Sequence, residues 1–336
     1  MDNCMIWSII VCSFNGEFRI AEALKSMFSA ISDYNPDQCE IILVDNRSTD
    51  RTAAIATSIS QSFPRISFSI IKEPIPGLIY ARVAGMRAAR GKYVSYLDDD
   101  NHPDLDYLET AERVFSLNTD VGIFGCSTRL PTNVVFPLDL DVYQRSYAVG
   151  ALPFSTGILP RGNAVWGAGM AIRRAALVDI LKSEYQPLLT GRSGGMQLAG
   201  DDSELAYAIE LRGWRVWYER KALVVHAIDT KRMTVENLRR MYEGFGASAL
   251  FLEIYRSAIR QGTPPSFFVI TRALAKNVVS DVISIAKSLG YVVTRQRPRW
   301  ELALTLAYTR AKWTAYGSSP ERRRQQLRNI YYLLRS

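Results

Sequence analysis

Residues 93–101 read Tyr93-Val94-Ser95-Tyr96-Leu97-Asp98-Asp99-Asp100-Asn101, a short apolar run that ends in three consecutive carboxylates. The run is typical of a buried β-strand over Tyr93–Leu97. Three neighbouring negative charges repel one another, so they favour a bound cation. An extended backbone would point Asp98 and Asp100 to the same side, where Mg²⁺ or Mn²⁺ could take their oxygens together with substrate phosphates. The alternative is a solvated acidic turn that caps a helix near Pro103.

Short β-branched runs alternate with helix-like segments on both sides of this stretch. The predicted strands are Ser8–Cys12, Glu40–Val44, Ser67–Ile71, Tyr93–Leu97, Val121–Cys126, Ala164–Ala171 and Arg215–Val225. The predicted helices include Arg19–Ile31, Thr49–Ser62, Leu78–Ala89, Leu105–Phe115 and Ser203–Leu211. This order is typical of an α/β fold with a mixed, mostly parallel sheet flanked by helices. In such sheets ligands bind beyond the carboxyl ends of the strands.

A second strand also ends in polar residues, Asp45-Asn46-Arg47-Ser48-Thr49-Asp50. Helix capping accounts for Ser48, Thr49 and Asp50, because short hydroxyl and carboxyl side chains accept hydrogen bonds from the first amides of a helix. Asp45 precedes the cap, and we expect its carboxylate to accept a hydrogen bond from a nucleobase.

A third acidic cluster, Gly200-Asp201-Asp202-Ser203-Glu204, opens a predicted helix. One carboxylate at a helix N-terminus is commonly a partner of the helix dipole. Three acids that follow a glycine-rich stretch favour a general base instead. Two long segments without a regular pattern, residues 128–162 and 183–200, are typical of lids or binding loops.

Length and composition point to a folded chain. The 336 residues are 48% hydrophobic and 22% charged, which excludes disordered and disulfide-stapled classes. The four cysteines have no CxxC spacing, and two histidines are too few for a His-rich metal site. Because the N-terminus carries Asp2 in place of a basic segment, we expect no signal peptide and a cytoplasmic location.

Charge divides the chain into two regions. Residues 1–255 carry 26 basic and 30 acidic side chains, whereas residues 256–336 carry 15 basic and 3 acidic ones. In the second region Phe267, Ile270, Leu274, Val278 and Val282 recur at helical spacing among basic residues, a pattern that predicts basic amphipathic helices. We expect this region to lie on the anionic inner face of the cell membrane without crossing it. Packing on the body of the protein or an oligomer interface is the alternative.

Taken together, these segments resemble the inverting family 2 glycosyltransferases, which have the GT-A fold, a Rossmann-like fold of nucleotide-diphospho-sugar transferases. The resemblance covers about residues 6 to 230. Its motifs occur in the family's order at residues 8–15, 44–50, 76–82, 97–100, 167–174, 200–202 and 224–226. It implies a GT-A catalytic domain over residues 1–255, followed by the basic helical region over residues 256–336.

The resemblance also implies a role for each acidic cluster. Asp98 and Asp100 match the DxD pair, with Asp100 the direct ligand of Mg²⁺ or Mn²⁺ and Asp98 nearer the ribose. His226 would be a further metal or diphosphate contact, or a structural histidine. Asp202 takes the place of the catalytic base, with the adjacent Asp201 as the other candidate and Glu204 as a distant third.

The remaining implied contacts concern the two substrates. The donor-binding residues are Ser13, Asn15, Asp45, Arg82, Asp98 and Asp99, and the acceptor-binding residues are Gly169 and Met170. The chain departs from the family pattern at Asn46, where a second aspartate is common, at Val83, where asparagine often follows Ala-Arg, and at Asp201, where glutamate is usual.

The expected function is metal-dependent, inverting transfer of a sugar from a nucleoside-diphosphate sugar, with UDP favoured. The acceptor would be a hydroxyl of a glycan or lipid-linked glycan, in cell-surface polysaccharide synthesis. A nucleotidyltransferase that makes sugar nucleotides is the alternative, but it should carry a glycine-rich, basic loop after the first strand, which Ser13-Phe14-Asn15-Gly16-Glu17 is not. A nucleic-acid-binding role for the basic region is a further alternative, although we expect no nucleic-acid partner. A homo-oligomer is compatible with the sequence.

Overall fold

The computed structural model describes residues 5–189, 192–193, 196–197 and 199–335. Within them one nine-stranded sheet has the order β3-β2-β1-β4-β8-β6-β11-β5, with β7 paired to β11. The strands are β1 (Trp7–Ser13), β2 (Cys39–Asp45), β3 (Ser67–Lys72), β4 (Tyr93–Tyr96), β5 (Asn101–Pro103), β6 (Val121–Arg129), β7 (Gly157–Ile158), β8 (Met170–Arg173) and β11 (Arg215–His226). A separate two-stranded sheet pairs β9 (Arg192–Ser193) with β10 (Met196–Gln197).

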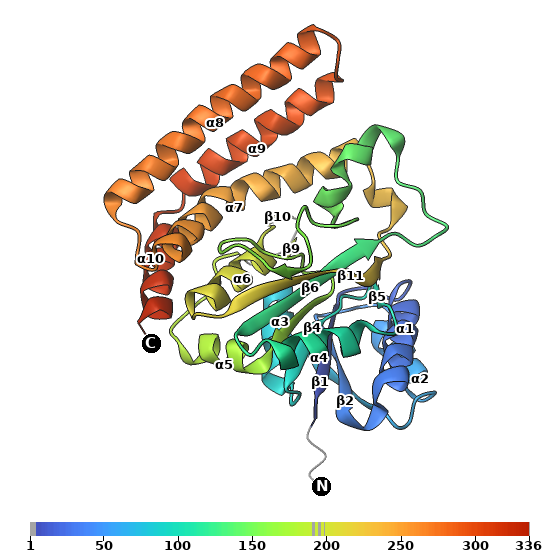
Figure 1. Ribbon diagram of the computed structural model, residues 1–336. Coiled ribbons are helices and arrows are strands. Elements are labelled where there is room, and N and C mark those ends of the chain that lie inside the picture. Colours follow the sequence, from blue (N-terminus) through green and yellow to red (C-terminus); the bar gives the residue numbers. More distant parts are fainter. Residues whose placement is uncertain (1–4, 190–191, 194–195, 198, 336) are drawn as a thin grey trace.

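Helices flank the sheet on both faces (Figure 1). The α-helices are α1 (Ile20–Tyr34), α2 (Thr52–Ser60), α3 (Leu78–Ala88), α4 (Tyr107–Leu117), α5 (Arg174–Lys182), α6 (Asp201–Leu211), α7 (Val235–Gln261), α8 (Phe267–Val293), α9 (Arg299–Gly317) and α10 (Pro320–Leu334). Short 3₁₀ helices lie at η1 (Pro36–Gln38), η2 (Leu138–Tyr147) and η3 (Thr230–Arg232). The predicted α/β architecture with a C-terminal helical extension is confirmed.

Strand β1 explains why the sheet needs cover on both sides. All seven of its residues are buried. Ile9 and Val11 pack among residues of α1 and α4, whereas Ile10 packs among residues of α3, α5 and α6. Successive side chains of a strand point to opposite faces, so an unbroken apolar run is stable only between two layers of helices.

The sheet is mixed and mostly parallel, as predicted. The parallel pairings join β1 to β2 and β4, β2 to β3, and β6 to β11, and together they cover more residues than the antiparallel pairings of β8 with β4 and β6 and of β11 with β5 and β7. One expectation about the sheet changes. The strand predicted at Ala164–Ala171 begins only at Met170. Gly169 has a φ of 73°, a left-handed conformation that ends the preceding irregular segment and turns the chain into β8.

The last four helices form a layer on one side of the sheet domain (Figure 1). Helix α9 packs between α7 and α8, and α10 packs on α6 and α7. Helices α7 and α9 approach closely at Gly246, where an added Cβ would lie 2.2 Å from the carbonyl oxygen of Tyr308. The predicted boundary between residues 255 and 256 falls inside α7, and the division into two domains stays a prediction.

A buried ion pair joins α8 to α9. Lys312 Nζ donates to Asp281 Oδ1 at 2.6 Å, and Trp313 Nε1 donates to the other oxygen of Asp281 at 2.7 Å. The two charged side chains are only 3% and 10% exposed. None of the helices among the described residues has both the length and the apolar character needed to cross a bilayer.

We expect Lys312→Met to destabilise the fold by about 3 kcal/mol or more, because the Asp281 carboxylate would stay buried without a cation. The midpoint of chemical denaturation measures this. The double variant Asp281→Leu/Lys312→Met removes both charges and should recover most of the loss. Lys25→Met, which breaks the exposed Lys25–Glu22 pair, is the matched control and should change stability by about 0.5 kcal/mol or less. Equal stabilities of all the variants would contradict this role for the buried pair.

Candidate active site

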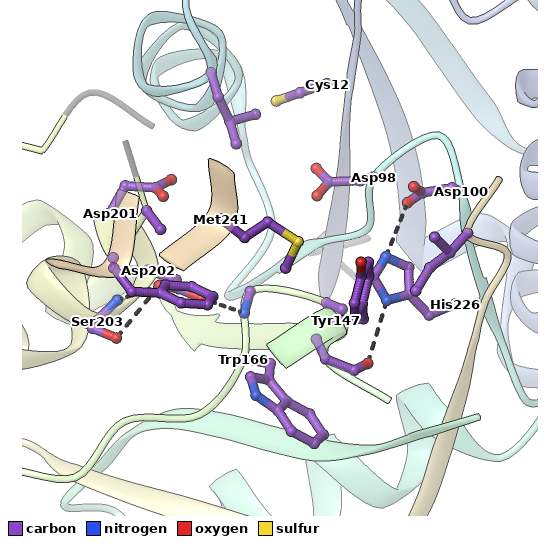
Figure 2. A pocket seen from close by; sticks show the side chains of 18 of the residues that line it. Cys12, Asp98, Asp100, Tyr147, Trp166, Asp201, Asp202, Ser203, His226 and Met241 are labelled. Carbon is purple, nitrogen blue, oxygen red and sulfur yellow. Dashed lines mark hydrogen bonds and ion pairs between the residues drawn. The ribbon is translucent and has the colours of Figure 1, made fainter. Parts of the chain in front are cut away.

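A cavity of about 1020 Å³ lies beyond the carboxyl ends of β1 and β4. Its walls come from the end of β1, the turn after β4, the start of α6 and the strand β11, and from helices α7 and α9 on the far side. Figure 2 shows acidic side chains of two segments around this cavity: Asp98 and Asp100 from the turn after β4, and Asp201 and Asp202 from the start of α6. The acids that are far apart in the sequence therefore meet in one place.

The triple-aspartate segment is a turn. The N–H of Asn101 donates to the carbonyl oxygen of Asp98 at 2.9 Å, which closes a turn over residues 98–101. The expectation of an extended backbone that alternates its side chains is therefore wrong. Asp98 and Asp100 nevertheless both line the cavity, because the turn directs both carboxylates toward it (Figure 2).

The middle carboxylate, Asp99, anchors the loop after β1. Arg19 donates to both of its oxygens, at 3.1 and 2.9 Å, and the hydroxyl of Ser13 donates to it at 2.6 Å. Burial raises the pKa of Asp99, although Arg19 and Ser13 oppose that shift. An added Cβ at Gly16 would lie 2.4 Å from Asp99 Oδ2, so the loop needs glycine there. Ser13 and Asp99, two predicted donor contacts, thus reach the cavity wall as a hydrogen-bonded pair.

Arg82 of α3 connects two of the acidic clusters. Its Nη1 donates to Asp201 Oδ2 at 2.7 Å, and its Nη2 lies 3.8 Å from Asp98 Oδ2. The guanidinium is 8% exposed and lies 5.4 Å from the centre of the Tyr96 ring. The pKa of Arg82 is raised, because the attraction of Asp201 and Asp98 outweighs the effect of burial, which lowers it. The guanidinium therefore stays charged and holds the two segments together.

The two candidate base carboxylates have different partners. Asp201 pairs with Arg82, whereas Asp202 accepts the N–H of Gly167 at 2.9 Å and that of Ser203 at 2.7 Å. Burial and the neighbouring Asp201 raise the pKa of Asp202, against the opposing effects of Arg82 and the two amides. A raised pKa makes a carboxylate a stronger proton acceptor. Asp202 is therefore better suited than Asp201 to accept a proton in this cavity.

His226 faces Asp100 across 3.8 Å, measured from Nε2 to Oδ1. Its Nδ1 lies 3.3 Å from the carbonyl oxygen of Ala148 (Figure 2). A carbonyl oxygen only accepts, so Nδ1 is the donor in this contact, and Nε2 is the ring nitrogen that faces the Asp100 carboxylate. An imidazole nitrogen and a carboxylate oxygen at this distance are groups that can share a cation.

The predicted three-residue metal site is not preassembled. Across the residues that the structure describes, no three His, Cys, Asp or Glu side chains come together as a metal site. Asp100 lies 3.8 Å from His226, whereas Asp98 lies 3.8 Å from the Arg82 guanidinium. A carboxylate and an imidazole fit Mg²⁺ or Mn²⁺ when substrate phosphates complete the coordination shell, since Mg²⁺ is usually bound by one or two carboxylates and a substrate.

Two further donor-binding predictions fall at the edge of the site. Asp45 Oδ1 accepts the N–H of Ser48 at 2.8 Å, and its role as a donor contact stays a prediction. Asn15 accepts the N–H of Thr49 at 2.9 Å. Among the described residues that line the cavity, neither appears; Asn46 does, and its amide holds the 73–77 segment through Glu73, Ile75 and Gly77.

The predicted acceptor contacts lie behind the cavity wall. Met170 is 1% exposed in β8, and an added Cβ at Gly169 would lie 2.6 Å from Cys126 Sγ. The neighbouring residues Trp166, Gly167 and Ala168 line the cavity instead. Gly167 allows the wall to close, because a Cβ there would lie 3.1 Å from Arg82 Nη2.

Sequence reasoning missed the far wall. Helix α7 contributes Met241, Phe245, Ser248, Ala249, Leu252 and Arg256, and α9 contributes Tyr308. Arg232 of η3 lies 4.0 Å from Asp100 Oδ2. The only sequence signal for these residues is helical periodicity, which does not say what a helix packs against. The wall formed by α7 and α9 is largely apolar and aromatic, and the acidic side chains lie on the opposite wall of the cavity.

Glu204, the third base candidate, has a structural role. It is 1% exposed and accepts the N–H groups of Leu188 and Leu189 and the hydroxyl of Tyr255. It therefore ties the segment before α6 to α7. Burial raises the pKa of Glu204 to about 7. The cavity lining among the described residues does not include it.

Part of the chain is similar in sequence to known glycosyltransferases. Residues 8–136 match the sequence model of the family described as glycosyl transferase family 2. The uncharacterized glycosyltransferase EpsJ of Bacillus subtilis (strain 168) is 36% identical over 105 residues, which are 31% of this chain and 27% of that protein. The chain spans about a third of the length of the curated relatives it matches.

Solved structures match nearly the whole chain. The mannosyltransferase PcManGT from Pyrobaculum calidifontis, in complex with GDP-Man and Mn²⁺, has a TM-score of 0.57 and 20% identity, over 91% of this chain and 86% of that one. TarS 1-349 of S. aureus, in complex with UDP, has a TM-score of 0.51 and 14% identity, over 94% of this chain and 92% of that one. At these identities the likeness establishes a GT-A fold.

We expect Glu204→Gln to change how stability depends on pH. Glu204 has a folded-state pKa of about 7 against 4.5 ordinarily, so the folded protein binds its proton more tightly than the unfolded chain does. This contribution to stability is complete below pH 4.5 and is lost as pH rises through 7. Relative to the variant, the natural protein should lose ~3 kcal/mol over that range in denaturation measured at several pH values.

Glu210, whose pKa burial also raises to about 7, is present in both proteins and cancels in the difference. A difference in stability that stays constant between pH 4 and 8 would contradict the assignment to Glu204.

Proposed function

We propose that the chain, whose residues 8–136 match the model of glycosyl transferase family 2, transfers a sugar from a nucleoside-diphosphate sugar to a hydroxyl of a glycan or lipid-linked glycan. The observation that carries the proposal is the single cavity in which Asp100 and His226 lie on one side and Asp202 on another. One side suits a cation and a diphosphate, and the other suits a proton acceptor. UDP-sugars are the favoured donors, and cell-surface polysaccharide synthesis is the favoured context.

The donor side is assigned to the acidic turn. Asp100, with His226 and Asp98 nearby, would hold Mg²⁺ or Mn²⁺, whose charge stabilises the departing diphosphate when it is bound. Arg82 keeps Asp98 in place and Arg232 adds positive charge beside Asp100. Two similar folds solved with GDP-Man and Mn²⁺ or with UDP are consistent with this class of donor.

The proton acceptor is assigned to Asp202. An acceptor hydroxyl must lose its proton as it attacks the anomeric carbon, and a carboxylate within hydrogen-bond reach can take it. Asp201 is neutralised by Arg82, whereas burial and Asp201 raise the pKa of Asp202. Direct attack from the side opposite the diphosphate inverts the anomeric centre and needs only one base.

The acceptor side is assigned to the wall that α7 and α9 complete. Trp166, Phe245 and Tyr308 offer aromatic surface there, and Met241 points into the cavity (Figure 2). Aromatic faces pack well against the C–H faces of sugar rings, since both are apolar surfaces with polar edges. This chemistry suits a glycan acceptor better than a small anion.

A nucleotidyltransferase is disfavoured by the loop after β1. Such an enzyme needs free backbone N–H groups there to bind triphosphate. The N–H groups of Asn15, Gly16 and Glu17 instead donate to Ser48, Thr52 and Asp50. The backbone N–H groups of this loop therefore already have partners in the segment that leads into α2.

We expect Asp202→Asn to lower kcat by ~10²- to 10⁴-fold, because the amide cannot accept the proton, while affinity for UDP changes little. Release of UDP from a panel of UDP-sugars with Mn²⁺ measures turnover, and calorimetry measures UDP affinity. Asp106→Asn, which changes an exposed carboxylate at the start of α4, is the matched control and should behave like the natural protein.

The reciprocal variant, Asp100→Asn, should weaken Mn²⁺-dependent UDP binding by about tenfold or more, since a carboxylate ligand is lost. If Asp202→Asn had the same kcat as the natural protein, Asp202 would have no role in the mechanism. Unchanged, Mn²⁺-independent UDP affinity in Asp100→Asn would remove the metal from the proposal.

A further inference from the structure

Helix α8 is apolar on the side that faces away from the protein. It lies at the outer edge of the molecule, with α9 on its inner side (Figure 1). Its exposed phenylalanine and aliphatic side chains are Phe267, Phe268, Val278, Val279, Val282, Ile283, Leu289 and Val293, and Tyr291 is exposed as well. Phe267 is 85% exposed and Val293, at the other end of the helix, is 72% exposed. At about 1.5 Å per residue, this face is ~40 Å long.

The inner side of α8 carries polar contacts that fix its orientation. Asp281 pairs with Lys312, Asn277 also accepts from Lys312 at 3.2 Å, and Ser288 shares a hydrogen bond with Thr305 at 3.0 Å. Ile270 and Leu274, in the first turns, are partly buried and pack on the core, and Ile285 and Val292 are also partly buried. The ion pair and the hydrogen bonds to α9 therefore hold α8 so that many of its large apolar side chains stay exposed.

Basic residues border this apolar face on one edge. At about 100° per residue, the exposed phenylalanine and aliphatic side chains span an arc of ~160°, and Arg272, Lys276 and Lys287 fall together at one edge of it, between the arc and Tyr291. The one acidic residue of α8, Asp281, is buried. Across the α8–α9 hairpin, residues 267–317, eight basic side chains stand against two acidic ones, and both acids pair with Lys312 and Arg297.

We propose that the outer face of α8 binds an anionic lipid surface, with the helix lying parallel to it. Apolar side chains would enter the boundary between headgroups and acyl chains, and the basic edge would reach the lipid phosphates through its long side chains. A second copy of the chain fits the face less well, because two such helices would bring only like charges together at their basic edges. The proposal does not depend on glycosyl transfer.

The test is flotation of the full-length chain with vesicles of phosphatidylcholine, with and without phosphatidylglycerol. The natural protein should float with the anionic vesicles and far less with the neutral ones. Phe268→Gln/Val282→Gln should lower partitioning by about tenfold through loss of apolar insertion, and Arg272→Gln/Lys276→Gln/Lys287→Gln should lower it to a similar extent through loss of charge. Glutamine keeps good helix propensity at these exposed sites.

The matched control is Leu117→Gln/Leu181→Gln, which changes two exposed leucines at the ends of α4 and α5, away from α8 in Figure 1. It should float like the natural protein, and circular dichroism should give the same helix content for all variants. No flotation of the natural protein, or equal flotation with neutral and anionic vesicles, would overturn the proposal. So would a dimer in light scattering that Phe268→Gln/Val282→Gln dissolves, because a second copy would then cover the face.

Discussion

One buried guanidinium sets the geometry of the cavity. Arg82 comes from α3, Asp98 from the turn after β4, and Asp201 from the start of α6, 119 positions along the chain from Arg82. A buried cation of this kind is stable only while its carboxylate partners stay in reach, since each isolated charge would pay a large cost of desolvation. The ion pairs therefore hold the donor turn and the start of α6 at fixed positions. They also leave Asp202, one residue beyond Asp201, facing the same cavity.

The C-terminal helices contribute both to the cavity and to the outer surface of the protein. Helix α7 supplies most of the apolar wall, and α9 reaches the cavity with Tyr308 because Gly246 lets the two helices approach closely. The same α9 carries Lys312 and Trp313, which fix α8 with its apolar face outward. One helical layer thus carries both the outer face of α8 and the apolar wall of the cavity.

The sequence predicted the parts of the fold and site that depend on local pattern. Continuous apolar runs identified the strands, and acids directly after a strand identified Asp98 and Asp100, because ligands bind beyond the carboxyl ends of the strands. Asp202 was identified from a cluster of acids at the start of a predicted helix. The hydrogen bond from the N–H of Ser48 to Asp45 could not be predicted, because the sequence does not distinguish an aspartate in an Asx turn from one with a free carboxylate. Gly169 and Met170 were assigned to the acceptor from the motif alone, and β8 starts six residues later than predicted, so that Trp166 lies on the wall instead. The apolar wall formed by α7 and α9 could not be predicted from the sequence, because helical periodicity does not show what a helix packs against.

Anomalous scattering tests most directly whether Asp100 and Asp202 face the same nucleotide-binding cavity. Crystals of the full chain grown with UDP and Mn²⁺ would be measured at the manganese absorption edge. We predict one anomalous peak beside the Asp100 carboxylate, with the UDP diphosphate next to it and Asp202 across the same cavity. A nucleotide bound with Mn²⁺ elsewhere on the molecule, with no peak beside Asp100, would contradict it.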